Sequence, residues 1–307
     1  MLPDYRSIAL LVHAGAGSGL GGRVAAQVAQ GIHAVFADAK LEIIETRSKE
    51  HIKEFGRTTE ADLIVCLSGD GSLHDIAQSL VRRAEGERPT LVPIPAGSGN
   101  DYARTLGLPL DPLKAAVALA ECRPFKVDVG CVNSTFFLET LSFGMDAAVA
   151  IKTEELRLAT KARGFLLYTH AAIDAIIHDF AAHKATVRMD DREFSCDTII
   201  FAVQNGPTYG GGYQVAPHAS IVDGMLDVYI ITGVNRPAAI YYLTQIKTGK
   251  HERLKGVSYH KTSHLQLEFA EQVPAQCDGE QLLGLTFDIS VLPGALDVLA
   301  VPSAYVR

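Results

Sequence analysis

Two glycine-rich turns in the first half of the chain carry the residues best suited to chemistry. The apolar run at 63–67 ends in Ser68-Gly69-Asp70-Gly71-Ser72, and residues 95–104 read PAGSGNDYAR. Glycine lets the backbone approach a ligand closely, and the N–H groups at the start of a helix attract anions. An aspartate in such a turn is compatible with phosphate when a divalent cation lies between the two charges. The pair of turns therefore predicts one shared polyphosphate–metal site.

Each turn also has a purely structural explanation. Asp70 could cap the helix that follows it, and Asn100 or Asp101 could cap a helix at 102–106, because short polar side chains accept hydrogen bonds from the first helical N–H groups. The first turn alone does not decide between capping and binding. The recurrence of glycine, serine and aspartate at two strand ends favours binding.

The elements that must position these turns alternate along the first half of the chain. Apolar, strand-like runs lie at 7–12, 41–46, 63–67 and 90–95, and segments with helical spacing lie at 24–36, 48–57, 73–84 and 111–121. This alternation predicts an α/β, doubly wound, mostly parallel sheet. Ligands of such sheets bind at the carboxyl ends of the strands, which is where both turns fall.

A third glycine-rich stretch follows the first strand. Gly17-x-Gly19-x-x-Gly22 fits the dinucleotide fingerprint, and Glu45 could bind a ribose, although it comes later than the usual spacing of about 20 residues. A turn that merely lets helix and sheet pack closely explains the stretch better. An NAD(P)-binding oxidoreductase therefore stays open only as an alternative.

Composition limits the class of protein. The net charge of −7 argues against a nucleic-acid-binding protein, for which a basic surface is expected. The five cysteines are scattered with no CxxC pair, which favours reduced thiols in a cytoplasmic protein. No stretch approaches the roughly 20 apolar residues of a spanning helix. Any membrane contact is therefore expected to be peripheral, at the inner membrane surface.

The second half of the chain has a different pattern of apolar residues. Strand-like runs dominate at 135–143, 184–189, 197–204, 226–232, 264–269 and 286–292, and one helical stretch interrupts them at about 152–181. This pattern predicts a β-rich domain, a sandwich, that begins near residue 126.

The two turns resemble known motifs. SGDGS and GSGND look like the GGDGT and GTGND motifs of the diacylglycerol kinase and sphingosine kinase superfamily, which includes bacterial diacylglycerol kinase-like lipid kinases. Ser68 replaces a glycine, Ser72 and Ser98 replace threonines and keep the hydroxyl, and His74 stands where asparagine is usual. NAD kinases share the first motif, so an NAD kinase-like phosphotransferase is a second alternative. The GND triplet resembles the lipid kinases more.

The resemblance implies an ATP-dependent kinase that transfers the γ-phosphate to a lipid hydroxyl, with diacylglycerol or a related lipid as acceptor, in phospholipid metabolism. It implies a nucleotide-binding domain at 1–126, on which segment 294–307 packs, and an acceptor domain at 127–293, with the nucleotide in the cleft. Asp70, Asp101 and Asp128 would hold the catalytic Mg²⁺. The matched nucleotide-binding positions are Thr46, Ser68, Gly69, Asp70, Gly71, Ser72, Gly97, Ser98, Gly99, Asn100 and Asp101.

Two loops of the second half complete the resemblance. In relatives, a loop like 216–228 holds a structural Mg²⁺, here through Asp223 and the carbonyl oxygens of Ser220 and Met225. Cys277-Asp278-Gly279-Glu280 matches the catalytic DGE, which makes Glu280 the general base and gives Asp278 the task of orienting metal or nucleotide. Without the family, both loops read as Asp-Gly hairpin turns. In a strict strand, Asp278 and Glu280 would share a face.

Membrane contact and assembly are less determined by the sequence. Two basic clusters could face anionic headgroups: Lys152, Arg157, Lys161 and Arg163, and Lys247, Lys250, Arg253 and Lys255. A solvated face explains each cluster at least as well. The identity of the lipid and the oligomeric state, a homodimer included, stay open. A non-enzymatic binding module would require that Glu280 be dispensable.

Overall fold

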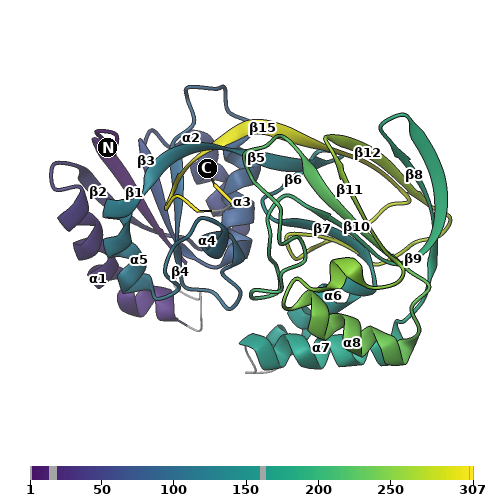
Figure 1. The fold of residues 1–307 in the computed structure, drawn as a ribbon. Helices are drawn as coiled ribbons and strands as arrows, with labels where there is room; N and C mark the ends of the chain where they lie inside the picture. Colours follow the sequence, from purple (N-terminus) through teal and green to yellow (C-terminus); the bar gives the residue numbers. More distant parts are fainter. Residues whose placement is uncertain (1, 14–18, 160–163, 304, 307) are drawn as a thin grey trace. The chain divides into compact units, whose positions relative to one another are not determined.

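A computed structural model describes residues 2–13, 19–159, 164–303 and 305–306 (Figure 1). The chain divides into two compact units. Unit 1 comprises Met1–Val129, Ile221–Asp223 and Pro293–Arg307, and unit 2 comprises Gly130–Ser220 and Gly224–Leu292. Each unit is described by itself below. Unit 1 thus ends three residues beyond the expected boundary and also takes in a short piece of the 216–228 loop.

Unit 1 is built on a parallel sheet. The strands β1 (Ser7–Val12), β2 (Lys40–Glu45), β3 (Leu63–Ser68) and β4 (Thr90–Pro95) lie in the order β2-β1-β3-β4. The end of the long strand β15 (Thr286–Ala300) continues this sheet beside β4. Every residue of β3 is buried, as expected of a central strand covered on both faces. The predicted doubly wound sheet is confirmed.

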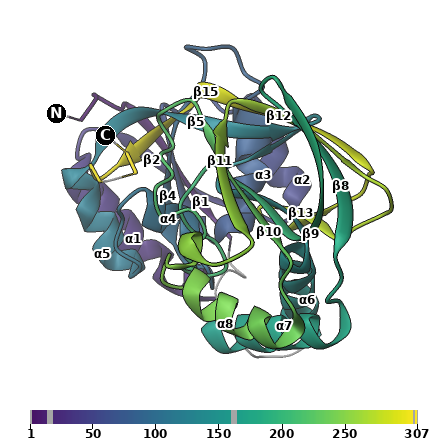
Figure 2. The same cartoon turned by 45° about the vertical axis from the view of Figure 1, so that its right-hand side comes forward.

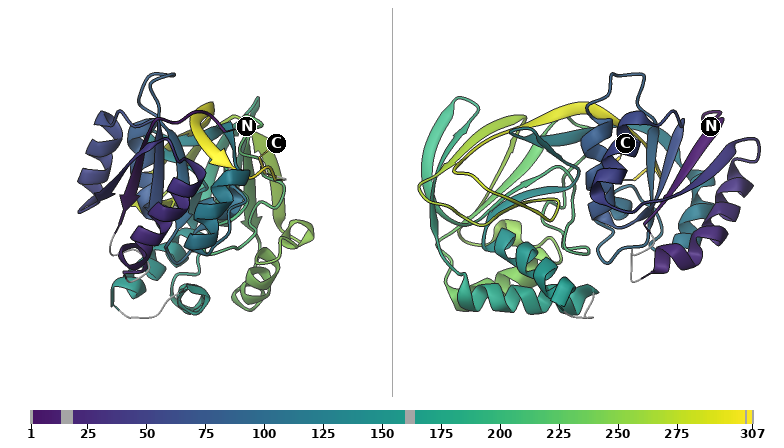
Figure 3. Two further views of the ribbon diagram at one scale, coloured as in Figure 1. Left: turned by 90° about the vertical axis from the view of Figure 1, so that its left-hand side faces the viewer. Right: turned by 180° about the vertical axis from the view of Figure 1, so that it is seen from behind.

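The strand order fixes where the helices lie. The connections are α1 (Leu20–Val35), α2 (Lys49–Thr58) and α3 (Asp70–Leu80), and β4 is followed by α4 (Asp101–Thr105), α5 (Pro112–Ala118) and the short η1 (Leu119–Glu121). The connection from β1 to β2 runs opposite to those that lead to β3 and β4. Because such crossovers are right-handed, α1 covers one face and α2 with α3 the other. Helix α5 packs on α1, and α2 packs on α3 (Figures 1 and 3).

That reversal marks the binding edge of the sheet. Connections leave the adjacent strands β1 and β3 in opposite directions, which opens a crevice at the carboxyl ends of these two strands. Residue Ser68 ends β3 at this edge, and the backbone N–H of His13, after β1, donates to the carbonyl of Leu67. Gly17 of the dinucleotide fingerprint lies outside the described residues.

Unit 2 is antiparallel. Its strands are β5 (Arg123–Val132, shared with unit 1), β6 (Thr135–Phe137), β7 (Thr140–Gly144), β8 (His183–Met189), β9 (Arg192–Gln204), β10 (Leu226–Thr232), β11 (Val257–Thr262), β12 (His264–Phe269), β13 (Ala275–Cys277), β14 (Glu280–Leu282) and the first part of β15. They run in the order β14-β13-β7-β9-β8-β12-β15, with β10 and β11 branching from β9, and with β5 and β6 branching from β15. This is the expected β-rich sandwich.

Two apolar clusters stabilise unit 2. In the first, the ring of Phe143 contacts those of Phe201, Phe269 and Phe287, so that strands far apart in sequence share one core. In the second, helices α6 (Met145–Ala159), α7 (Gly164–His178) and α8 (Arg236–Ile246) cover β9 and β10. Helices α7 and α8 lie side by side (Figures 1 and 2), and the short η2 (His251–Arg253) follows α8.

Several boundaries differ from the sequence-based expectation. The strand expected at 135–143 is two strands, and the helical stretch expected at 152–181 begins at Met145 and is divided between α6 and α7. The elements β11, β13, β14 and α8 were not expected. Helix α8 had a readable signal, because Asn235 caps it by accepting from the N–H of Ala238 and a proline lies in its first turn.

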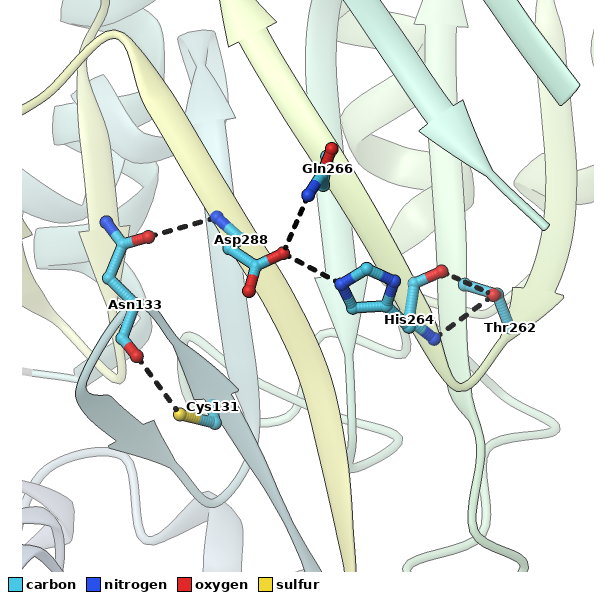
Figure 4. A network of polar contacts seen from close by, with 6 residues as sticks. All are labelled: Cys131, Asn133, Thr262, His264, Gln266 and Asp288. Carbon is cyan, nitrogen blue, oxygen red and sulfur yellow. Dashed lines mark hydrogen bonds and ion pairs between the residues drawn. The ribbon is translucent and has the colours of Figure 1, made fainter. Parts of the chain in front are cut away.

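A polar network fixes the register of β15 within unit 2 (Figure 4). Asn133 and Asp288 are joined by two hydrogen bonds, one from each backbone N–H. The Asp288 carboxylate accepts from His264 at 2.7 Å and from Gln266 at 3.4 Å on β12. The His264 contact is the main cause that lowers the pKa of Asp288. The network therefore ties the turn after β5 and two strands together.

Candidate active site

The two glycine turns lie directly against each other in unit 1. A Cβ atom on Gly97 would come within 2.5 Å of the Gly69 Cα, and a Cβ on Gly69 would lie 3.1 Å from the Gly97 Cα. The backbone N–H of Ala96 also donates to the carbonyl of Ser68. Neither glycine can carry a side chain without displacing the other turn. The structure thus brings residues 68–72 and 96–101 together at one edge.

Asn100 shapes the second turn. Its side-chain oxygen accepts from the N–H of Gly97 at 2.8 Å, and its amide nitrogen donates to the Gly97 carbonyl at 2.9 Å. Its φ of 56° is left-handed, a conformation that asparagine tolerates better than most residues. The Asn100 side chain makes no capping hydrogen bond to α4, so the capping explanation for Asn100 is wrong. The two hydrogen bonds between Asn100 and Gly97 leave Ser98 exposed at the tip of the loop, with Gly99 half-buried beside it.

Asp70 links the two turns. It is the first residue of α3, and it does not cap that helix, since Gly69 occupies the capping position. Instead its carboxylate accepts from the N–H of Tyr102, in the first turn of α4, at 3.3 Å. Burial, and next the neighbouring carboxylate of Asp101, raise the pKa of Asp70 well above its usual range. Two carboxylates therefore meet where the loops join, and Asp101 is almost fully buried.

The hydroxyl groups at this edge differ in their hydrogen bonds and in their exposure. Ser68 has an ordinary strand backbone, and its buried hydroxyl donates to the carbonyl of Gly69 and lies 3.1 Å from the Cys66 sulfur. The buried Thr46 hydroxyl donates to the carbonyl of Val12, at the end of β1. In the first turn of α3, Gly71 is exposed and Ser72 is half-buried. The groups most accessible to a ligand are therefore on α3 and on Ser98.

Asp128 and residues 221–223 of the 216–228 loop belong to unit 1. The Asp128 carboxylate accepts from the N–H of Gly294 at 2.9 Å, and its own N–H donates to the carbonyl of Ile221. The N–H of Ile221 donates to the carbonyl of Tyr305. Asp223 is exposed, and Ser220 and Met225 are half-buried. Throughout the described part of the chain, no group of three or more His, Cys, Asp or Glu residues is arranged to hold a metal.

The Asp278-Gly279 turn of unit 2 is a two-residue hairpin between β13 and β14. Both residues have positive φ, 47° and 91°, as type I′ hairpin turns require. Asp278 therefore lies in the turn and not in a strand, so the argument that it shares a strand face with Glu280 is wrong. Glu280 is the first residue of β14 and is half-buried.

The Asp278 carboxylate is bound to backbone. It accepts from the N–H groups of Leu138, Glu139 and Thr140 at 2.7, 3.0 and 3.0 Å, and its own N–H donates to the carbonyl of Thr140. These hydrogen bonds satisfy the backbone N–H groups of residues 138–140, where the strand expected at 135–143 is interrupted. The side chain thus anchors the turn that carries Glu280.

Two buried carboxylates in unit 2 were not singled out from the sequence. Glu139 packs against Gly206, where a Cβ atom would lie 1.7 Å from a carboxylate oxygen, so a side chain at 206 would force the Glu139 carboxylate to move. Asp146, in the first turn of α6, accepts a hydrogen bond from the Tyr209 hydroxyl, and burial raises the pKa of its carboxyl to about 7. Residues 205–212 contain Asn-Gly and Gly-Gly-Gly, but no local pattern identifies the acidic partners of this loop.

Comparison with known proteins gives a consistent picture. The family profile described as "Diacylglycerol kinase catalytic domain" matches residues 7–132, and the one described as "YegS C-terminal NAD kinase beta sandwich-like domain" matches residues 139–300. The second match covers more than half of the chain.

Curated relatives carry related names. A "Probable lipid kinase YegS-like" of Chromohalobacter salexigens is 29% identical over 237 residues, which is 77% of this chain and 75% of that protein. A "Probable lipid kinase YegS" of Salmonella gallinarum is 28% identical over 244 residues, 78% of each chain. Among solved structures, a diacylglycerol kinase from Bacillus anthracis superposes with a TM-score of 0.79 at 22% identity, covering 98% of this chain and 99% of that one. The last likeness supports the fold.

Proposed function

The chain belongs to the diacylglycerol kinase-like lipid kinases of the YegS family, and from this we propose that it transfers the γ-phosphate of ATP to the hydroxyl of diacylglycerol or a related lipid. Membership makes it a phosphotransferase with an alcohol acceptor. One observation carries the more specific proposal: two glycine turns, each bearing an aspartate, are in backbone contact at the carboxyl edge of a parallel sheet.

The nucleotide would bind along this edge. Phosphoryl transfer needs positioning and charge neutralisation more than covalent chemistry from the protein. Gly69, Gly71, Gly97 and Gly99 would let phosphate oxygens reach backbone N–H groups, and the start of α3 would add its dipole. Ser72, Ser98 and Thr46 would supply hydroxyl contacts. For Ser68 and Asn100, whose side chains bond within the turns, we propose that they shape the site for the nucleotide.

Two of the proposed ligands suit a divalent cation, because Asp70 and Asp101 are neighbouring carboxylates whose mutual repulsion a cation would relieve. We propose Asp128 as a third ligand, directly or through water, although among the described residues the three carboxylates are not already gathered into one metal-binding group. Mg²⁺ held there would neutralise charge on the transferring phosphate. For the second metal, one carboxylate (Asp223) and two carbonyl oxygens (Ser220, Met225) are hard ligands that suit Mg²⁺ or Ca²⁺. The bond between Ile221 and Asp128 supports a fixed loop at that position.

On the acceptor side, Glu280 would take the proton of the lipid hydroxyl as it attacks the γ-phosphate. The three hydrogen bonds from backbone N–H groups to Asp278 support a positioning role for that residue. We propose this role instead of direct contact between Asp278 and metal or nucleotide. General-base assistance of this kind typically contributes about 10²–10⁴-fold to the rate.

A direct assay tests the function. Purified protein is incubated with γ-labelled ATP and Mg²⁺ against a panel of diacylglycerol, related glycerolipids, a sphingoid base and NAD, and the labelled products are resolved. We expect label in a lipid product. Label in NADP alone would replace the proposal with NAD kinase activity, and absence of ATP turnover with every acceptor would leave a binding module.

Proton competition gives a prediction for the metal site. Burial raises the pKa of Asp70, so the metal-free folded protein holds this proton more tightly than the unfolded chain and loses stability as pH rises. Mg²⁺ needs the deprotonated carboxylates. We therefore expect Mg²⁺ at about ten times its Kd to stabilise the protein by about 1.4 kcal/mol at about pH 8 and by less at about pH 5.5, measured by thermal melting.

Asp70→Asn is the control for that measurement. Without the charge, the metal-free variant is expected to melt no lower than the wild type at about pH 8, and Mg²⁺ is expected to raise its Tm little at either pH. An equal Mg²⁺ effect in both proteins would contradict the assignment of Asp70 as a ligand.

Peripheral membrane contact is proposed for helix α8. Its surface carries Ile240 and Tyr241, each 53% exposed, and basic residues lie at and after its end: Lys247, Lys250, Arg253 and Lys255, all exposed. Apolar side chains within a basic surround suit an anionic lipid surface. The first basic cluster has less support, because Lys152 forms ion pairs with Asp174 and Asp179. The side chains of Arg157, Lys161 and Arg163 lie outside the described residues. No described helix is both long and apolar enough to cross a bilayer.

Vesicle sedimentation tests this contact. Each basic residue near an anionic surface contributes about 1 kcal/mol, so the double variant Lys247→Glu, Lys250→Glu is expected to lower binding to phosphatidylglycerol vesicles by at least about tenfold. Lys184→Glu, Arg192→Glu reverses the same number of exposed charges elsewhere in unit 2 and is the matched control. Equal binding of all three proteins would remove α8 from the contact.

A further inference from the structure

The turn that carries Glu280 is bonded to a chain of buried side chains. The N–H of Gly279 donates to the side-chain oxygen of Gln276 at 2.7 Å. The amide nitrogen of Gln276 donates to the Ser142 hydroxyl, again at 2.7 Å. Gln276 and Ser142 are completely buried. The turn is thus connected, through side chains alone, to the middle of strand β7.

A second polar pair lies beside this chain. The carboxylate of Asp146, in the first turn of α6, lies near Ser142 and accepts a hydrogen bond from the hydroxyl of Tyr209. Asp146 and Tyr209 are more than nine-tenths buried. Gln276 and Ser142 therefore form a short buried polar path from the turn to β7, in an otherwise apolar interior.

The direction of every bond in the path follows from its first member. A backbone N–H can only donate, so Gln276 must present its oxygen to Gly279 and its nitrogen to Ser142. The Ser142 oxygen then accepts. The path has one consistent polarity, which favours a single arrangement of the turn.

The surrounding elements make this arrangement rigid. Helix α6, which bears Asp146, packs against both strands of the β13–β14 hairpin. Hydrogen bonds in a buried, low-dielectric environment are stronger than in water, and such networks specify one geometry. The turn is also held from its other residue, because Asp278 binds the backbone of 138–140. Loss of the hydrogen bond between Gly279 and Gln276 would leave the hydrogen bonds of the Asp278 carboxylate intact.

We propose that Gln276 and Ser142 are positioning residues that fix the tight turn and so direct the Glu280 carboxylate at the acceptor hydroxyl. This inference rests on the proposed role of Glu280. The two residues act on the turn and do not touch the substrate. A misplacement of about 1 Å at a reacting group costs about 10²-fold in rate, so a loosened turn has a measurable effect on catalysis.

The decisive variant is Ser142→Ala, which removes the acceptor of the Gln276 amide with the loss of one oxygen atom. We expect kcat for lipid phosphorylation to fall about tenfold to a hundredfold, while the KM for ATP stays unchanged. Thr198→Val is the matched control, because it removes another buried hydroxyl of unit 2, one that donates to the carbonyl of Ile200 and has no part in the path. Its kcat is expected to match the wild type at a comparable loss of Tm.

A double variant separates positioning from general damage. In the Glu280→Gln background, Ser142→Ala is expected to change the residual single-turnover rate little, since the carboxylate that the path positions is gone. An equal fold-loss in both backgrounds, or an unchanged kcat in Ser142→Ala alone, would overturn the inference. Normal turnover of Glu280→Gln by itself would instead overturn the proposed role of Glu280 as the base, and absence of kinase activity in the wild type would overturn the proposed function. If Ser142→Ala does not fold, the same measurements on Gln276→Met, which removes both hydrogen bonds of that side chain, decide the question.

Discussion

Glutamine in place of Glu280 is expected to lower kcat by about 10²–10⁴-fold while ATP still binds. The substitution keeps the size of the side chain and removes its ability to accept a proton. Glu280 is half-buried at the start of β14, where it lies opposite Cys277 in the hairpin. The measurement is steady-state lipid phosphorylation, with ATP binding followed separately by calorimetry or thermal shift.

Asp278→Asn is the informative contrast. Its carboxylate accepts from three backbone N–H groups, and an asparagine would turn its own NH₂ group toward one or more of them. We therefore expect this variant to lose both activity and thermal stability, whereas Glu280→Gln loses activity alone. Near-normal turnover in Glu280→Gln would remove the DGE turn from the mechanism.

Alanine in place of Gly97 is expected to abolish nucleotide binding and to destabilise unit 1. The new Cβ would lie 2.5 Å from the Gly69 Cα and 3.0 Å from the Asn100 side-chain oxygen. Backbone atoms cannot move aside as the end of a flexible side chain can, so the two turns must separate. Overpacking of this kind costs about 1–3 kcal/mol. Thermal melting with and without Mg²⁺–ATP measures both effects.

Gly71→Ala is the matched control for that clash. A Cβ at Gly71 meets no heavy atom within 4 Å, and alanine favours the helical conformation of α3 by up to about 1 kcal/mol. Its metal-free and ATP-free stability should equal or exceed that of the wild type. Weakened ATP binding at undiminished stability would support a bare-backbone contact at this position. Wild-type melting and ATP binding in Gly97→Ala would show that the contact between the turns is dispensable.

Local patterns were sufficient where one segment decides its own structure. The apolar runs at 7–12, 63–67 and 90–95 became β1, β3 and β4 with nearly the expected bounds, because central parallel strands are buried on both faces. Asp278-Gly279 became a hairpin turn, as its two residue types favour. The glycine-rich turns were likewise identified from the residues at 68–72 and 95–104 alone.

What sequence reasoning missed depends on contacts between distant segments. The break in the strand expected at 135–143 exists because Asp278 binds the N–H groups of 138–140, well over a hundred residues earlier in the chain. Asp70 looked like a helix cap, and its actual partner is the N–H of Tyr102 in another turn. Asp146 and Tyr209 are unremarkable in their own neighbourhoods, and only the folded unit brings them together. No periodicity or spacing encodes such pairs.

The strand that pairs with β4 at the border of the parallel sheet is made late. Val298 of β15 pairs with Leu91, so about two hundred residues separate the two partners in the chain. While the ribosome is still producing the second half, the side of β4 that β15 will cover exposes backbone N–H and C=O groups, a known site of wrong intermolecular pairing. The parallel sheet of unit 1 can therefore be completed only after β15 has been synthesised, long after β4.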